Sequence, residues 1–516
     1  MSDTSTQSNT ESSASSSTFR TESTTTHHSV DLNGLEFRYR AIAEWTSLRK
    51  IHKPVAEVFH TSYFAENGDS SSRPLTFVFN GGPGAASAFL HMGALGPQRV
   101  MFGESGTLPP MPVQVVDNLE TWLTFTDLVF IDPVGTGFSR AIKDGTGSAD
   151  SGVAKDRGVA KDRTDEPNEN PDFWDIDKDL DSLGELICRI LSQHDRWLSP
   201  LFIAGESYGG FRVAKMVRSL QEKHGVGLCG ALLISPAIEF EGLFGTDYNL
   251  THWVELFPSL AATAHQHKLT RNIDADSSLD DVVEIAGTFA TVELSRWLAL
   301  GDALPESERA PIVTRMAELT GLSESFIERA AGRITAPQFC RELLREQRRV
   351  LGMYDASVSA VDPFPDRTEF EGPDPSLMSI DPLFTAAINH QLRLTLKVDS
   401  ELDYRLICMD VYLKWKHESA EHVFKEVVGA MDDLRYGMSL NEHMKVFIAH
   451  GVFDLVTPCY STARQVGLMK LSDDQANNLT TKNYSGGHMF YSWDSSRVAF
   501  RVDAEAFFQS AIPKRD

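Results

Sequence analysis

The sequence has little positive charge for its length and contains no long apolar run. Among its 516 residues, 48 Lys and Arg stand against 72 Asp and Glu, which gives a formal net charge of −24 and a pI near 5.1. A surface with this charge repels phosphate backbones and anionic lipid headgroups, so we expect no nucleic-acid partner and no membrane partner. No apolar stretch approaches the roughly 18 residues that a transmembrane helix needs.

Cysteine is also scarce, and the five cysteines show neither a CxxC motif nor a paired spacing. An odd number in a chain of this length argues against a disulfide framework and favours a reducing compartment. The first 26 residues lack the basic start and the apolar stretch of a secretory signal, and 17 of them are Ser or Thr. We therefore expect a cytoplasmic protein whose residues 1–30 form a disordered tail. The cysteines are Cys188, Cys229, Cys340, Cys408 and Cys459.

Five short apolar runs, each ending in a turn, indicate strands that are buried on both faces of a sheet. Segments such as 180–191, with apolar residues three and four apart, predict amphipathic helices between them. Such an alternation indicates an α/β protein with a mostly parallel sheet, and half-buried strands near 35–40 and 55–59 precede it. The five runs are 75–79, 127–131, 201–204, 231–234 and 445–449.

Two segments interrupt this alternation. Residues 143–170 are polar and hold two identical copies of Gly-Val-Ala-Lys-Asp-Arg, which we interpret as a duplicated surface loop because two copies of six residues cannot form a solenoid. Residues 242–435 are mostly helical by pattern and predict a cap over the carboxyl edge of the sheet. The copies lie at 152–157 and 158–163, the predicted cap helices include 279–300, 306–319 and 341–351, and the core comprises 31–241 and 436–516.

Gly205-Glu206-Ser207-Tyr208-Gly209 has the G-x-S-x-G pattern of a nucleophile elbow. An apolar strand precedes the motif, and a helix with a buried stripe follows it. A sharp strand-to-helix turn lifts the serine hydroxyl clear of the sheet, and side chains in place of the flanking glycines would clash. Ser207 is therefore the predicted nucleophile. The alternative is a glycine-rich connection with an incidental serine.

A serine hydroxyl needs a base that a carboxylate orients. In the fold that uses this elbow, the chain order is serine, acid, histidine, with the acid and the base in loops after late strands. Asp454 follows the run 445–449, and His488 lies 34 residues later, behind two glycines that allow a tight loop. His450 precedes the acid and is the weaker candidate for the base.

The same reaction needs backbone N–H groups where negative charge develops on the substrate oxygen. Tyr208, which follows the nucleophile, supplies one donor, and the glycine-rich turn 80–84 is placed to supply another. That turn could instead cradle a phosphate, but no Gly-Lys-Ser/Thr follows it and the acidic chain offers no basic cluster. The sequence points to no metal and to no cofactor.

Five sequence blocks, in order, resemble the serine carboxypeptidase family and span most of residues 35–510, with the features of a cytoplasmic member of bacterial type. The resemblance implies an α/β-hydrolase fold with a helical insertion, which releases C-terminal amino acids through an acyl-enzyme from peptides with a free C-terminus. It implies Gly82 and Tyr208 as oxyanion donors. It also implies that Asn80, Gly81 and Glu206 hold the terminal carboxylate. The blocks are Asn80-Gly-Gly-Pro-Gly84, Asp132-Pro-Val-Gly-Thr-Gly-Phe-Ser139, Gly205-Glu-Ser-Tyr-Gly-Gly210, the Asp454 loop and Gly487-His488.

The chain also departs from the family pattern. Ala85 and Ala86 stand where secreted members usually carry Cys-Ser, and Val78 replaces a frequent tryptophan. Some members place a second carboxylate beside the elbow glutamate, and Ala94 occupies that position here. Glu206 can bind a carboxylate only when it is protonated, because two carboxylates repel each other. The alternative role for Glu206 is structural, and a strict preference for a free C-terminus has less support than the hydrolytic machinery.

Three other functions are compatible with these residues. An acyltransferase passes the acyl group to an alcohol, as some plant relatives do, and an esterase lacks the preference for peptides. A catalytically silent protein would bind partners through the cap, but competent residue types stand at every triad and oxyanion position. The sequence leaves open which C-terminal residue is removed, and whether the chain is a monomer or a homodimer.

Overall fold

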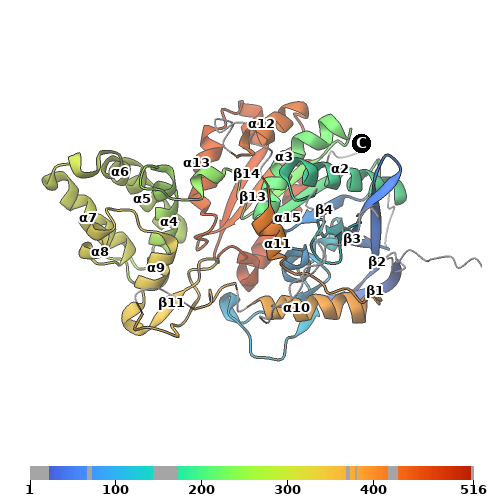
Figure 1. Cartoon of the computed structure of the whole chain (residues 1–516), viewed down its shortest axis with the longest axis horizontal. Helices are drawn as coiled ribbons and strands as arrows, with labels where there is room; N and C mark the ends of the chain where they lie inside the picture. The colour runs from blue at the N-terminus through green and yellow to red at the C-terminus, as the bar shows by residue number, and fades with distance from the viewer. Residues whose placement is uncertain are drawn as a thin grey trace, which may run out of the picture.

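A mixed sheet of ten strands forms the centre of the protein (Figure 1). The computed structural model describes residues 23–66, 72–142, 173–367, 372–377, 380–416 and 428–512. Strands β1, β2 and β3 form an antiparallel edge, β3 pairs antiparallel with β7, and the strands from β7 onward run parallel in the order β7-β4-β9-β10-β13-β14. The strands are β1 (Thr24–Leu32), β2 (Leu35–Lys50), β3 (Lys53–Ala65), β4 (Leu75–Phe79), β7 (Asp127–Ile131), β8 (Arg140–Ala141, on β3), β9 (Leu201–Glu206), β10 (Gly230–Ile234), β13 (Lys445–Gly451) and β14 (Leu479–Tyr484), with a separate pair β5 (Gln98–Val100) and β6 (Val115–Asp117).

The five predicted buried runs form the middle of this sheet. β4, β7, β9 and β10 contain only buried residues, and β13 has one half-buried residue at its start. Strands in this position are covered on both faces, which explains why their sequences are continuous apolar runs rather than alternating ones. Their parallel pairing confirms the α/β prediction. Helix α3 follows β9 directly after Ser207, and this strand–turn–helix within a mostly parallel sheet is the arrangement of an α/β-hydrolase fold.

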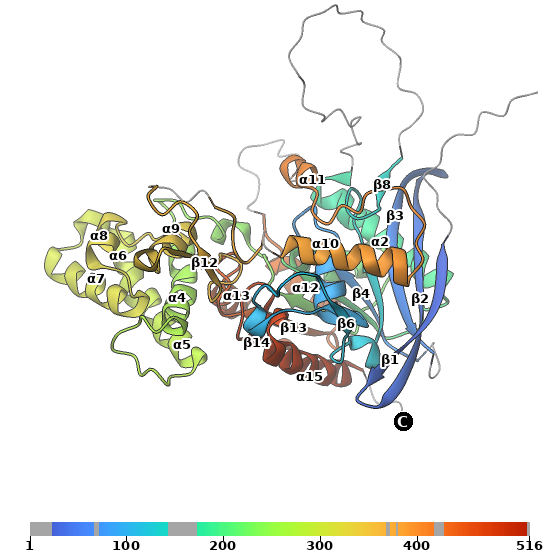
Figure 2. The same ribbon diagram turned by 90° about the horizontal axis from the view of Figure 1, so that it is seen from below.

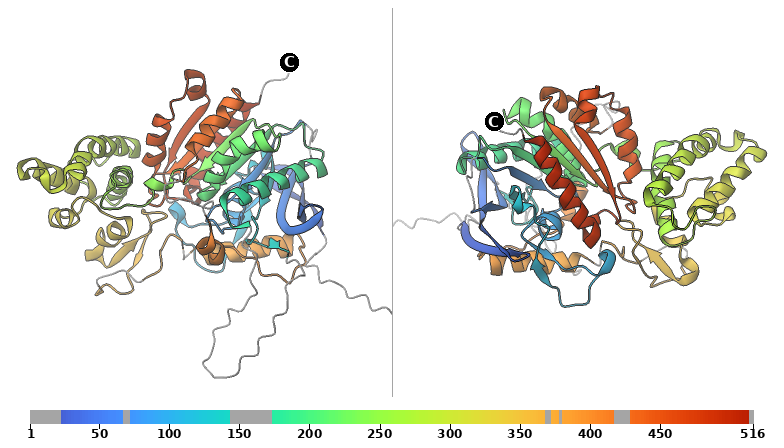
Figure 3. Two further views of the ribbon diagram at one scale, coloured as in Figure 1. Left: turned by 45° about the horizontal axis from the view of Figure 1, so that its top comes forward. Right: turned by 180° about the vertical axis from the view of Figure 1, so that it is seen from behind.

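Helices cover both faces of the sheet (Figures 2 and 3). Neighbouring residues of β4 belong to different core clusters, Phe77 to the cluster under α2, α3 and α12 and Val78 to the cluster under α10 and α15. The predicted stripe at 180–191 is the buried face of α2. These helices are α2 (Ile176–Gln193), α3 (Tyr208–Lys223), α10 (Asp381–Asn389), α12 (Met431–Leu440) and α15 (Asp494–Ala511), with α1 (Ala88–Leu90), α11 (Met409–Lys414), α13 (Cys459–Leu468) and α14 (Asp473–Asn477) beside them.

A helical lobe lies to one side of the sheet, where it is coloured yellow-green in Figure 1, and has its own apolar core. The predicted helices at 279–300 and 306–319 are confirmed, the first with a π-helical turn in its middle. The predicted helix at 341–351 is wrong, because Arg348 has a φ of 54° that ends the helical path, and the next residues form a strand. The lobe comprises α4 (Thr251–Gln266), α5 (Leu279–Phe289), α6 (Ser295–Leu300), α7 (Glu306–Thr320), α8 (Glu324–Arg329), α9 (Ala336–Glu342), β11 (Arg349–Leu351) and β12 (Ser359–Val361).

The later part of the predicted cap packs on the core instead. Helix α10 buries Leu383, Phe384 and Ile388 in the cluster that includes β4, and α12 buries Leu434 in the cluster on the other face. The predicted cap at 242–435 was therefore too long at its carboxyl end. A helical pattern shows that one face is buried but does not show against which surface, so the sequence could not divide this segment.

The amino-terminal prediction also needs correction. We expected a disordered tail over residues 1–30, but Thr24–Leu32 form β1, which pairs residue by residue with β2 and buries Val30. A Thr-rich segment can still be ordered when a neighbouring strand supplies hydrogen-bond partners for its backbone, as β2 does here. The β-branched side chain of threonine also suits an edge strand. Residues 1–22 and the whole loop 143–170, with its two hexapeptides, lie outside the described residues. Within the described ranges, no helix is both long and apolar enough to span a bilayer.

Candidate active site

Ser207 occupies the turn between β9 and α3. Its backbone has a φ of 60° and a ψ of −123°, a region that non-glycine residues enter only when the surrounding structure forces them. The Ser207 N–H donates to Ile234 O at 2.9 Å. Its carbonyl oxygen accepts from the N–H groups of Gly210 and Ala237, at 2.9 and 3.1 Å. The predicted nucleophile thus lies on a strained turn that hydrogen bonds from α3 and from the end of β10 hold in place.

The two glycines of the motif are required by close packing. A Cβ on Gly205 would lie 2.0 Å from the carbonyl oxygen of Gly209, and a Cβ on Gly209 would lie 2.6 Å from that of Phe79. Both distances are far below ordinary van der Waals contact. The pattern G-x-S-x-G therefore follows from how tightly α3 meets β4 and β9.

Asp454 and His488 meet at the carboxyl edge of the sheet. His488 Nδ1 lies 2.6 Å from Asp454 Oδ2, and Asp454 is fully buried. The N–H groups of Val456 and Thr457 donate to Asp454 Oδ1 at 2.8 and 3.0 Å, and the Thr457 hydroxyl donates to Oδ2 at 2.6 Å. Because an Asp454 oxygen faces Nδ1, that nitrogen carries the proton of the neutral imidazole and Nε2 is left free to accept one.

Burial lowers the pKa of the His488 imidazole, but the charge of Asp454, the hydrogen bond to it and the charge of Glu206 together raise the pKa above its usual value. Ser207 and His488 are hydrogen-bonded to two consecutive residues at the end of β10. Ile234 O accepts from the Ser207 N–H, and the Ser235 hydroxyl donates to His488 O at 2.8 Å. Among the described residues no hydrogen bond joins the Ser207 hydroxyl to His488. In hydrolases this contact is often long without substrate and tightens in the complex.

His450, the weaker candidate for the base, forms a hydrogen bond that is structural. Its Nε2 lies 2.9 Å from the Thr462 hydroxyl, and the ring is buried. Burial lowers the pKa of His450 to about 4. An imidazole that is turned toward Thr462 on α13 is not available to Ser207, so the structure favours His488 as the base.

The predicted oxyanion residues lie together against the elbow. A Cβ on Gly81 would be 2.5 Å from Tyr208 N, so the turn 80–84 touches the first residue of α3. Tyr208 is the first residue of its helix, where an N–H has no acceptor within the helix. Gly82 has a φ of 102°, which only glycine adopts readily. The turn 80–84 thus lies against Ser207 and the first residue of α3, while the roles of Gly82 and Tyr208 as oxyanion donors stay a prediction.

Glu206 is buried among polar side chains. One carboxyl oxygen accepts from Asn80 Nδ2, and the other accepts from the Tyr491 hydroxyl at 2.7 Å. The Asn80 amide is fixed in this orientation because its Oδ1 accepts from Leu90 N–H at 3.0 Å. Burial raises the pKa of Glu206 to about 7, although the charge of His488 and the hydrogen bonds from Tyr491 and Asn80 act in the opposite direction. This carboxyl group changes its charge near neutral pH.

Part of the chain is similar in sequence to serine carboxypeptidases. Residues 51–281, which include the turn 80–84 and the elbow, match the family model described as serine carboxypeptidase. The chain is also 29% identical over 196 residues to a curated serine carboxypeptidase-like protein, number 45, of Arabidopsis thaliana. That match covers 36% of this chain and 34% of the plant protein, so the chain spans about a third of the length of that relative.

Solved structures of α/β-hydrolases overlap with the chain at low similarity. A proline iminopeptidase of Mycobacterium smegmatis is 12% identical, with 91% of this chain and 98% of that chain covered and a TM-score of 0.36. The peroxisomal α/β-hydrolase Lpx1 of Saccharomyces cerevisiae is 10% identical, with 93% of each chain covered and a TM-score of 0.33.

The departures from the serine carboxypeptidase pattern can now be placed. Ala94 is buried in the core beside Gly93, and a Cβ on Gly93 would be 2.8 Å from the Tyr491 ring. The chain therefore brings a phenol to Glu206 next to the position where the family pattern has a second acid in some members. Tyr491 was not among the predicted site residues, since it lies three residues after His488 in a stretch with no recognised motif. All five cysteines are free.

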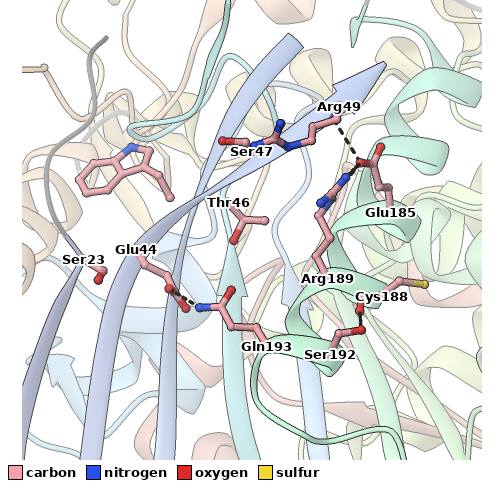
Figure 4. Close-up of a pocket in the computed structure, with 11 residues that line it drawn as sticks. Ser23, Glu44, Thr46, Ser47, Arg49, Glu185, Cys188, Arg189, Ser192 and Gln193 are labelled. Atoms are coloured by element: carbon pink, nitrogen blue, oxygen red, sulfur yellow. Dashed lines mark hydrogen bonds and ion pairs between the residues drawn. The ribbon is translucent and has the colours of Figure 1, made fainter. Parts of the chain in front are cut away.

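Other features of the described residues lie apart from this site. No cluster of three or more His, Cys, Asp or Glu in the described ranges could hold a metal ion. A polar cavity of about 1200 Å³ lies between β2 and α2, where Glu44 accepts from Gln193 Nε2 at 2.7 Å (Figure 4). β2 is four strands from β9 in the sheet, a lateral distance of roughly 19 Å at the usual strand spacing. This cavity is not part of the candidate active site.

Proposed function

We propose that the chain is a serine-type carboxypeptidase that hydrolyses C-terminal peptide bonds through an acyl-enzyme. His488 Nε2 takes the proton of the Ser207 hydroxyl while the serine oxygen attacks the carbonyl carbon of the last peptide bond. The N–H groups of Gly82 and Tyr208 stabilise the oxyanion. His488 then gives its proton to the leaving amine, and Asp454 orients the ring throughout. A water molecule, activated by His488 in the same way, releases the acyl group and restores Ser207.

The observation that carries this proposal is the buried polar cluster of Glu206, Asn80 and Tyr491, next to the nucleophile in the chain. Asn80 presents its NH₂ group there, and Glu206 can donate a hydrogen bond when it is protonated. With a pKa raised to about 7 by burial, Glu206 keeps its proton in a large share of molecules at neutral pH. The backbone of Gly81 lies against Glu206 and Ser207, beside these side chains. A terminal carboxylate is the substrate group that such donors would recognise.

The test uses N-blocked dipeptides and their C-terminal amides, with products identified by mass spectrometry. We expect release of the last amino acid from the free acids, slower cleavage of the amides, and no cleavage by Ser207→Ala. Hydrolysis of simple esters without any cleavage of peptides would replace the proposal with an esterase. Transfer of the acyl group to an added alcohol in preference to water would replace it with an acyltransferase.

We also propose a cytoplasmic location. The five free cysteines support it, as does Ala85-Ala86 at the position where secreted relatives usually carry Cys-Ser. Cell fractionation tests this location, and recovery of the protein from the medium would contradict it.

A further inference from the structure

A loop of the helical lobe is hydrogen-bonded to both loops that carry the acid and the base. This lobe loop, residues 352–358, joins β11 to β12 and lies more than 90 residues before Asp454 in the chain. It contacts the residues on either side of Asp454, and it contacts His488 itself. The contacts are Leu455 N–H to Met353 O at 3.0 Å, Ala356 N–H to Phe453 O at 3.0 Å, and His488 N–H to Tyr354 O.

One side chain of the lobe loop reaches the base loop directly. Asp355 Oδ2 accepts from Gly487 N–H at 3.0 Å and from Trp493 Nε1 at 3.2 Å. Asp355 Oδ1 accepts from the N–H and the hydroxyl of Ser357, at 3.0 and 2.5 Å. The Asp355 side chain is buried, so these four donors replace the water that the carboxylate has lost.

The geometry around His488 leaves the base loop little freedom. The two consecutive amides at Gly487 and His488 both donate to the lobe loop. A Cβ on Gly487 would lie 2.1 Å from Tyr354 O and 2.4 Å from the Asp355 Cα. The Tyr354 ring meets the imidazole edge to face, with centroids 5.3 Å apart. The backbone that sets the direction of the imidazole is thus fixed by the lobe rather than by the sheet alone.

We propose that Asp355 is a positioning residue, which holds the loop of His488 so that the imidazole meets Asp454 and faces Ser207. It touches no reacting atom in this arrangement. Its effect is geometric, and a displacement of about 1 Å in a catalytic group can cost on the order of 100-fold in rate. The helical lobe accordingly supports the triad and does more than cover it.

The test compares Asp355→Ala and Asp355→Asn with Ser357→Ala as the matched control. The substrate is p-nitrophenyl acetate, which has no carboxylate, and the rate of labelling of Ser207 by a fluorophosphonate is measured in parallel. We expect Asp355→Ala to lower kcat and the labelling rate by about 10- to 100-fold with KM little changed. Asp355→Asn should lose less, because its amide oxygen can still accept from Gly487. Ser357→Ala removes one of the two donors to Oδ1 but leaves both bonds from Oδ2 to the base loop, so it should lose clearly less kcat than Asp355→Ala.

A pH profile separates positioning from a loss of folded protein. When the imidazole moves away from Asp454, its pKa falls, and the acid limb of kcat/KM shifts to lower pH. Burial lowers this pKa, while Asp454 and Glu206 raise it. Should Asp355→Ala fail to fold, Asp355→Asn carries the test. A wild-type kcat in Asp355→Ala would overturn the proposal. So would a loss of kcat equal to the loss in the fraction of protein that the fluorophosphonate labels, together with an acid limb at the wild-type pH.

The outcome is independent of the carboxypeptidase assignment. A wild-type protein that hydrolyses the ester and reacts with the fluorophosphonate, but cleaves no peptide, would remove the proposed peptidase function and leave the role of Asp355 to be decided by the variants. A wild-type protein that reacts with neither reagent would overturn both proposals.

Discussion

Replacing Glu206 by Gln removes a titrating proton from the polar cluster of Glu206, Asn80 and Tyr491 but keeps a hydrogen-bond donor at position 206. In the proposed reaction, the terminal carboxylate of a peptide accepts a hydrogen bond from Glu206 only while Glu206 is protonated. Burial raises the pKa of Glu206 to about 7, against the effects of His488, Tyr491 and Asn80. Above that pH, kcat/KM of the wild type on free-acid peptides should fall roughly tenfold per pH unit, so about a tenth remains at pH 8.

The polar cluster can accept the substitution Glu206→Gln without large rearrangement. Because Leu90 N–H fixes the Asn80 amide, Asn80 Nδ2 still points at position 206, and the new amide oxygen can accept from it. The new NH₂ group then faces the Tyr491 hydroxyl, which can turn and accept. The variant should therefore fold normally and show a flat alkaline limb on free-acid peptides.

Tyr491→Phe perturbs the same carboxyl group by raising its pKa rather than by removing its proton. The phenol donates to Glu206 and stabilises its ionised form. One hydrogen bond to a charged group is worth about 1.5–3 kcal/mol, which corresponds to an upward pKa shift of roughly one to two units when it is lost. The alkaline decline of Tyr491→Phe should move to higher pH by that amount.

The assay is kcat/KM between about pH 5.5 and 9 on an N-blocked dipeptide and on its C-terminal amide. The amide is the control, because it lacks the charge that ionised Glu206 repels. The reasoning is refuted if wild type and Glu206→Gln share one pH profile and one acid-to-amide preference. Glu206 would then be a structural residue of the elbow.

Three further predictions concern the triad, a buried ion pair and the edge strand. The variants Ser207→Ala, Asp454→Asn and His488→Ala should each lower kcat by roughly 10⁴-fold or more, and the double variant Ser207→Ala/His488→Ala should be little worse than either single change, as steady-state kinetics will show. Arg212→Met should lower the free energy of unfolding by about 3–5 kcal/mol in urea titrations, because it leaves Asp179 buried without the 2.6 Å ion pair. Arg218→Met, at a partly exposed position of the same helix that pairs with Glu222 and Asp433, should cost less than about 1 kcal/mol. A chain that begins at residue 33 should melt at a lower temperature than one that begins at residue 23, because it lacks β1 and the buried Val30; equal melting temperatures would contradict the stabilising role of this strand.

The parts of the site that the sequence could predict are those that depend on neighbours in the chain. The elbow needs a strand, a tight turn and a helix within about twenty residues, and each leaves its own signal around Ser207. The loops of Asp454 and His488 follow late strands, so chain order and glycines were sufficient to find them. The buried runs of the parallel sheet were found for the same reason, since each is a continuous apolar segment with a turn at its end.

The parts that the sequence could not predict depend on contacts between distant segments. Tyr491 and Glu206 are 285 residues apart. No sequence pattern indicates which residue a tyrosine in a loop will contact. Asp355 lies in the predicted cap, just after the segment 341–351 that was wrongly predicted to be helical, and only the fold brings it to Gly487, 132 residues away. β1 has the composition of a disordered tail, and its order comes from the ladder that β2 provides.

The coupling between His488 and Glu206 leads to a last prediction, on the acid limb of the pH profile. Burial lowers the pKa of His488, Asp454 raises it by charge and by hydrogen bond, and the charge of Glu206 raises it further. His488 acts as a base only when it is neutral, so activity rises as the pH passes its pKa. On peptide amides, which tolerate an ionised Glu206, Glu206→Gln removes the nearby negative charge, so the pKa of His488 should fall and the acid limb should move to lower pH. On free-acid peptides the active form already has a neutral Glu206, so only the alkaline limb should change. An acid limb that stays in place on peptide amides would show that the two groups do not interact, and would contradict the placement of Glu206 beside His488.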